Sequence, residues 1–192
     1  MSSQAPASLP FTCNAEADAL LAADPLALLI GFVLDQQITT IKAFGGPLEL
    51  CRRAGTLEPS AIGAMDPAEL DRLFRQTPAL HRFPGTMAKR VQAACAIVAA
   101  RYGGDASRIW REAASADDLV ARLTELPGIG VEKARDILGI LVNRYGLQTA
   151  GSEPLMPELP SLAYVDSEAA LAGYLGWKRN AKAEARAAEK ER

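Results

Sequence analysis

The chain has 192 residues, of which 49% are hydrophobic and only 6% aromatic, and its formal net charge at pH 7 is −2. This length can bury one substantial core or two small ones, and the small net charge excludes a protein that coats nucleic acid through bulk positive charge. The three cysteines, Cys13, Cys51 and Cys95, lie far apart, which excludes a zinc ribbon or a local four-cysteine iron–sulfur site and is typical of a reducing compartment.

The N-terminus, MSSQAPASLPF, has neither a basic stretch nor a long apolar run, so we expect no signal peptide. The segment PLALLIGFVL at 25–34 is apolar throughout, but its 10 residues are too few to span a bilayer. We therefore expect a buried helix there, a cytoplasmic protein and no membrane partner.

Helix-forming segments rich in Ala and Leu follow one another along the chain, and no run of alternating β-branched residues predicts a strand. The segment 58–76 is expected to break into two short helices at Asp66–Pro67, where Asp caps and Pro begins the second helix. The expected helical segments are 15–23, 25–46, 47–55, 58–76, 86–104, 105–115, 115–126 and 131–146. The pattern predicts an all-α fold.

The character of the chain changes after Gly146. The segment 147–163 carries three prolines, which predicts an ordered or semi-ordered loop. A further helix is expected to open at Asp166 or Ser167, and the charged, Ala-rich end at 179–192 is expected to be a solvated helix rather than a binding element.

Positive charge is concentrated in the middle of the chain. Residues 75–111 hold seven Lys or Arg and one acidic residue. By contrast, residues 1–74 hold four Lys or Arg and nine acidic residues, and residues 112–177 hold four Lys or Arg and ten acidic residues. A localised basic face is what contact with phosphates requires, although a solvated helix surface has the same composition.

The string LPGIGVEKA places a tight turn between two helices. Pro127 ends the first helix, Gly128 and Gly130 supply backbone freedom, and the next helix begins at Val131. The amides at that helix start have no intrahelical partners, so they form a binding site for an anion. Ile129 would pack back between the helices, and a plain corner between helices is the alternative interpretation.

This string resembles the helix-hairpin-helix motif of DNA-binding proteins. The resemblance implies that Gly128, Ile129 and Gly130 lie against a backbone phosphate of DNA. It also implies a site for a monovalent cation, Na⁺ or K⁺, at the backbone carbonyls of Leu126 and Gly128.

Two further segments, LLIGFVLDQQITTIKAF and HRFPGTMAKRVQAACAIV, resemble segments of the helix-hairpin-helix (HhH-GPD) base-excision DNA glycosylases, in that family's order and spacing. The chain is most similar to a poorly characterised branch without an iron–sulfur cluster. The resemblance implies an all-α, two-lobed fold. Its parts would be a central lobe at 26–146 with the helix-hairpin-helix at 116–145, an N-terminal segment 1–25 packed with the C-terminal lobe, an insertion loop at 147–163, and a C-terminal helix and tail at 164–192.

Glycosylases that act on a duplex take the base out of the stack and fill the hole left behind. Gln37, with Gln36 beside it, matches the residue that fills the hole in this family, and a surface amide pair at a helix end is the alternative. His81 lies in the basic segment, where DNA contact, the lining of a pocket and a loop histidine without a role are all open. The residues expected at DNA are Gln36, Gln37, His81, Arg82, Lys89, Arg90, Gly128, Ile129, Gly130 and Lys133.

Members of the family with lyase activity carry a lysine two residues after the second hairpin glycine, where it forms a Schiff base with the sugar. Glu132 occupies that position here, and Lys133 is about 100° further round the helix. We therefore expect no lyase activity and place Lys133 at a phosphate or in solvent. Phe32 stands where adenine-specific members carry a catalytic glutamate, which argues against that specificity.

The catalytic acid of the family is an Asp that follows the hairpin, in a context such as Val-Asp-Ser. The usual spacing falls near Ala150, and the matching context occurs later, at Asp166, which is our first candidate for the acid; a helix cap is the alternative. Asp35 and Glu153 are weaker candidates. No cysteine follows Asp166, so no iron–sulfur cluster is expected.

The sequence therefore predicts a DNA-binding base-excision repair protein, a monomer acting on double-stranded DNA that holds a damaged or flipped base. The leading hypothesis is a monofunctional DNA glycosylase that hydrolyses the N-glycosidic bond. The alternatives are a non-catalytic helix-hairpin-helix protein that binds DNA or DNA damage, and a helical interaction protein.

Overall fold

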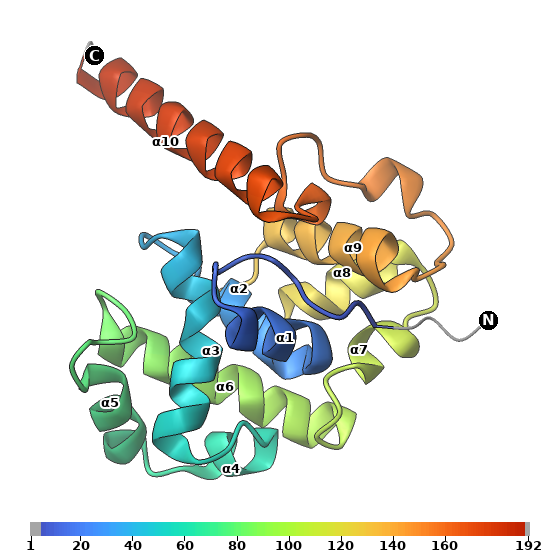
Figure 1. Ribbon diagram of the computed structural model, residues 1–192. Coiled ribbons are helices and arrows are strands. Elements are labelled where there is room, and N and C mark those ends of the chain that lie inside the picture. The colour runs from blue at the N-terminus through green and yellow to red at the C-terminus, as the bar shows by residue number, and fades with distance from the viewer. Residues whose placement is uncertain (1–4, 191–192) are drawn as a thin grey trace.

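A computed structural model describes residues 5–190, and every regular element within that range is a helix (Figure 1). The predicted all-α class is confirmed. In chain order the elements are α1 (Ala15–Ala23), α2 (Pro25–Leu34), α3 (Thr40–Ala54), α4 (Pro59–Ala64), α5 (Pro67–Arg75), α6 (Pro84–Tyr102), α7 (Arg108–Arg111), α8 (Ala116–Thr124), α9 (Val131–Tyr145), the 3₁₀ turns η1 (Glu153–Leu155) and η2 (Leu162–Tyr164), and α10 (Glu168–Lys190).

Helix α2 lies at the centre of the molecule. Nine of its ten residues are buried, which is the pattern of a helix surrounded on all sides rather than one at a surface. It packs against α1, α3 and α6. Asp24 accepts hydrogen bonds from the amides of Leu26 and Ala27, so the same residue ends α1 and begins α2.

The expected helix 25–46 is interrupted, because α2 ends at Leu34 and α3 begins at Thr40. Thr39 caps α3 by accepting a hydrogen bond from the Lys42 amide. Helix α3 then runs without a break through Gly45-Gly46-Pro47, where we expected one helix to end and another to begin. Phe44, Leu48 and Leu50 are buried along it, so packing outweighs the low helix propensity of that tripeptide.

Three predicted helix boundaries are confirmed. Asp66 caps α5 and accepts from the amides of Ala68 and Glu69, Ser115 caps α8 and accepts from the amide of Asp118, and Gly146 ends α9 in a left-handed conformation. In the expected segment 105–115, only Arg108–Arg111 is an α-helix.

The C-terminal part of the chain passes over α9 before α10 leaves the body of the molecule (Figure 1). Turn η2 packs on α9, and Asn143 donates to the Ala163 carbonyl. The Ser167 hydroxyl accepts from the Ala170 amide and thereby opens α10. The segment 1–25 was expected to pack with the C-terminal lobe; its helix α1 packs on α3 and α2, and Tyr145 of α9 donates to its Ala22 carbonyl.

Within residues 5–190, no helix by itself has the length and apolarity needed to cross a membrane. Helices α1 and α2 meet that test only when taken together, with a bend of 114° between them.

Close packing of α2 on α3 yields a first prediction. A Cβ at Gly31 would lie 2.5 Å from the Phe44 ring, which is itself fixed by edge contacts with Phe11 and Phe32. We expect Gly31→Ala to lower the free energy of unfolding by about 1–3 kcal/mol through overpacking. Chemical denaturation monitored by circular dichroism measures this change.

Gly45 supplies the matched control, because a Cβ there meets nothing within 4 Å. Gly45→Ala in the interior of α3 should raise stability by about 0.5–1 kcal/mol. Equal effects of the two substitutions would contradict the packing described for α2 and α3.

Candidate nucleic-acid interface

The predicted hairpin lies between α8 and α9. Gly128 has φ +92, in the left-handed region that glycine adopts without strain. Leu126 and Ile129 are buried in the core, so only the backbone of Ile129 can face a ligand. Gly130 caps α9 with an extended backbone and no side-chain cap, and a Cβ there would meet open space. The first amides of α9 therefore point out of the molecule at an open helix start.

The two glutamines after α2 have different environments. Gln36 is half-buried: its Nε2 donates to the Val33 carbonyl over 2.9 Å and its Oε1 accepts from Arg90 of α6. Its amide also lies against the hairpin, because a Cβ on Gly128 would be 2.9 Å from Gln36 Nε2. Gln37 is exposed and has φ +56, so a strained backbone presents its side chain at the surface. Gln36 therefore braces the loop, and Gln37 is the glutamine whose side chain lies at the surface.

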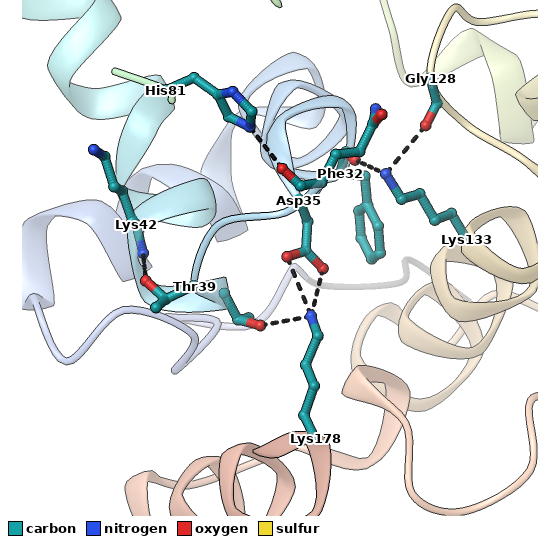
Figure 2. A network of polar contacts seen from close by, with 10 residues as sticks. Phe32, Asp35, Thr39, Lys42, His81, Gly128, Lys133 and Lys178 are labelled. Carbon is teal, nitrogen blue, oxygen red and sulfur yellow. Dashed lines mark hydrogen bonds and ion pairs between the residues drawn. The ribbon is translucent and has the colours of Figure 1, made fainter. Parts of the chain in front are cut away.

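His81 does not lie at the surface, which corrects our expectation that it contacts DNA. It is 1% exposed, its Nδ1 accepts from the Phe83 amide over 3.0 Å, and its Nε2 lies 2.8 Å from the Gln36 carbonyl (Figure 2). Because Nδ1 accepts, Nε2 carries the proton and donates to Gln36. Burial lowers the pKa of His81, against the opposing effect of its hydrogen bond to Gln36. His81 thus ties the start of α6 to the glutamine loop.

The basic segment forms a shallow hollow at the start of α6. Arg82 and Lys89 are exposed there, as expected of phosphate contacts, whereas Arg90 is held by Gln36. Phe83 also lines the hollow and is 42% exposed, with the Arg82 guanidinium 4.6 Å from its ring centroid. An exposed aromatic ring beside cations is a surface on which a base can stack, and the sequence alone did not single it out.

Lys133 points inward, which corrects our placement of its side chain at phosphate or in solvent. Its Nζ donates to the carbonyls of Phe32 over 2.7 Å and of Gly128 over 3.1 Å (Figure 2). Burial lowers the pKa of Lys133 to about 8, although the nearby carboxylate of Asp35 acts in the opposite direction. The ammonium therefore lies on the Gly128 carbonyl to which we assigned a monovalent cation.

The Leu126 carbonyl, the other backbone atom assigned to that cation, accepts from the Ile129 amide over 3.1 Å. Among the described residues, no group of three or more His, Cys, Asp or Glu side chains could hold a metal ion.

Of the three candidate acids, the structure encloses Asp35 and leaves the other two at the surface. Asp166 and Glu153 are exposed, and none of the three acids lines a described pocket. The hydroxyl of Ser167, not the carboxylate of Asp166, caps α10. The Asp35 side chain is 11% exposed and directly precedes the glutamine pair. Asp35, a weaker candidate than Asp166 in the sequence, is therefore the least exposed of the three.

Asp35 is held by Lys178, which also contacts Thr40, and the sequence alone revealed neither group. Lys178 of α10 lies 3.0 and 3.2 Å from its two carboxylate oxygens and also donates to the Thr40 hydroxyl over 2.9 Å (Figure 2). A third missed group, Asp136 of α9, accepts from Ser161; its burial raises its pKa, and the charge of Asp35 raises it further. Lys178 is 143 residues from Asp35 along the chain, so no local pattern predicts their contact.

We compared the chain with protein-family models, with curated proteins and with solved structures, and found no match.

The pH dependence of stability tests the role of His81. The pKa of His81 is lowered from 6.5 in the folded protein. The neutral imidazole therefore contributes fully to the free energy of unfolding above about pH 6.5, and this contribution is lost as the pH falls from there through the folded pKa. We expect the stability difference between the wild type and His81→Gln to shrink over that range. Denaturation at a series of pH values measures it, and a difference that grows on acidification would contradict the buried, neutral imidazole.

Proposed function

We propose that this protein binds duplex DNA at a damaged base and takes that nucleotide out of the stack. One observation carries the proposal: Gln36 joins the hairpin glycine Gly128 to an exposed Gln37 in a strained conformation. A phosphate held at the hairpin would fix the duplex relative to Gln37, which would fill the space that the displaced base leaves.

Electrostatics support the same orientation of DNA. The open amides at the start of α9 provide neutral donors for one phosphate. Arg82 and Lys89 provide exposed cations on α6, next to the loop that His81 and Arg90 tie to the glutamines. These groups would contact the backbone of any sequence, so recognition would depend on how easily a base leaves the stack.

We further propose that the protein hydrolyses the N-glycosidic bond of the displaced nucleotide, with Asp35 as the acid. As the bond from C1′ to the base nitrogen breaks, positive charge develops on the deoxyribose, and an adjacent carboxylate stabilises it. A water molecule then forms the new bond to C1′, and its proton leaves with the base. Lys178 would hold the carboxylate in position, and Thr40 in turn accepts a hydrogen bond from the same ammonium.

An imine between Lys133 and the sugar is not part of this proposal. Its amine donates to two backbone carbonyls in the interior and would have to leave both before it could attack a sugar.

A second function, binding of DNA damage without hydrolysis, is favoured by one observation. The Lys178 ammonium lies within 3.2 Å of both carboxylate oxygens of Asp35, and this contact competes with a sugar for the same charge. Such a protein would mark the lesion for another repair factor.

The hairpin is tested by a charge placed at Gly130. Asp and Asn both cap helices well, and both fit the open space there, so neither substitution should lower stability. We expect Gly130→Asp to weaken binding of duplex DNA by about tenfold or more, because its carboxylate repels phosphate at the amides. Fluorescence anisotropy with a labelled duplex measures the affinity.

Gly130→Asn is the matched control: its uncharged cap competes for the same amides without repelling phosphate, so this variant should bind DNA more tightly than the Asp variant. Equal affinities of the Asp and Asn variants would remove the hairpin from the proposed interface.

The acid is tested by comparing two asparagine variants. We expect Asp35→Asn to slow base release by about 100-fold or more, because the developing positive charge loses its partner. Asp166→Asn, at an exposed position, should leave the rate unchanged. Release is measured by chromatography of free bases from duplexes carrying alkylated, deaminated or oxidised bases. A wild type that binds these duplexes and releases no base would establish the second function instead.

A further inference from the structure

A groove runs between the start of α3 and the middle of α10. Its floor is apolar and consists of Ile38, Ile41 and Leu175, whereas its rim carries Lys178, Arg179 and Lys182. From the sequence alone we expected the segment from 179 onward to be a solvated helix rather than a binding element, and the groove departs from that expectation. The ion pair of Lys178 with Asp35 and its hydrogen bond to Thr40 hold α10 against the loop and so form the groove.

The rim has uncompensated positive charge. Arg179 and Lys182 are exposed, lie three residues apart on one face of α10, and form no ion pair with another side chain that the structure describes. Two such cations above an apolar floor attract a ligand that is anionic at one end and apolar at the other.

The floor is open enough to receive such a ligand. Ile41 is 37% exposed although it is a large aliphatic residue, and Ile38 and Leu175 are partly buried beside it. The floor begins at Ile38, one residue after Gln37, so the groove adjoins the residue that we propose enters the base stack.

We propose that this groove binds a DNA nucleotide that has left the base stack, with its base on Ile38, Ile41 and Leu175 and its phosphates at Arg179 and Lys182. This inference rests on the proposed function and adds the place where the displaced nucleotide is held. A nucleotide combines a flat, apolar face with phosphates, which is the chemistry that the floor and the rim offer together.

An anionic membrane is the other surface that a basic helix can contact. Binding to a membrane requires an apolar face that inserts into lipid. The apolar side chains here lie in a recess between two elements, and Trp177, the exposed aromatic of α10, stacks near Tyr174 with ring centroids 6.0 Å apart. The groove therefore favours a single nucleotide over a bilayer.

The experiment compares a fully paired duplex with the same duplex carrying one unpaired nucleotide, using anisotropy at fixed salt. We expect the wild type to prefer the bulged duplex by about tenfold, in line with one good stacking contact. The variant Arg179→Glu/Lys182→Glu should lose that preference, and Ile41→Ser should reduce it about threefold, because part of the stacking surface is removed. Thermal melting confirms that each variant is folded.

The variant Arg52→Glu/Arg111→Glu is the matched control. It carries the same change in net charge on exposed arginines of α3 and α7, each with one acidic partner. Both double variants should bind the paired duplex more weakly by similar factors, but only the groove variant should lose the preference for the bulge.

The possible outcomes distinguish a failure of this inference from a failure of the proposed function on which it rests. A wild type that binds neither duplex would overturn both. Binding of duplex DNA with an unchanged preference in the groove variant would overturn the groove alone. A third outcome would assign the rim to membranes instead. In that case the wild type binds vesicles of phosphatidylserine, and the groove variant loses this binding but keeps the preference for the bulged duplex.

Discussion

The C-terminal end of α2 is the constraint on which the candidate interface depends. A helix leaves its last carbonyls without intrahelical donors, and α2 ends inside the protein, where water does not supply them. Lys133 donates to the Phe32 carbonyl, and Gln36 donates to the carbonyl of Val33. The next segment is tied in the same way, since His81 donates to the carbonyl of Gln36. The hairpin, α6 and the glutamine loop therefore converge on one helix end because that end requires donors.

This requirement explains which parts of the interface could be predicted from the sequence. The hairpin and the helix caps depend on contacts between residues that are close in sequence. They could therefore be predicted from Gly128, Asp66 and Ser115 and a few neighbouring residues. The exposed position of Gln37 also agrees with its expected role, which itself stays a prediction. The all-α class follows from composition and periodicity in the same way.

The expectations that failed concern polar side chains whose partners are distant in the chain. His81 bonds across 45 residues and Lys133 across 101, and both were placed at DNA because an isolated polar residue is usually exposed. Asp166 was preferred to Asp35 because of its neighbours in the sequence. The burial of Asp35, however, depends on its contact with Lys178 of α10, which lies 143 residues later in the chain. The break in the helix at 35–39 was missed for two reasons. The apolar periodicity of α2 continues into α3. In addition, the residue with positive φ in this break is Gln37, and a glutamine does not indicate such a conformation in the sequence as a glycine would.

The same helix end links the acid to the groove. A helix C-terminus carries partial negative charge, so a carboxylate such as Asp35 is unfavourable there unless a cation accompanies it. Lys178 is that cation, and it is also the residue that holds α10 beside Ile38 and Ile41. The charge that would stabilise a developing cation on the sugar thus also positions the surface proposed to receive the displaced nucleotide.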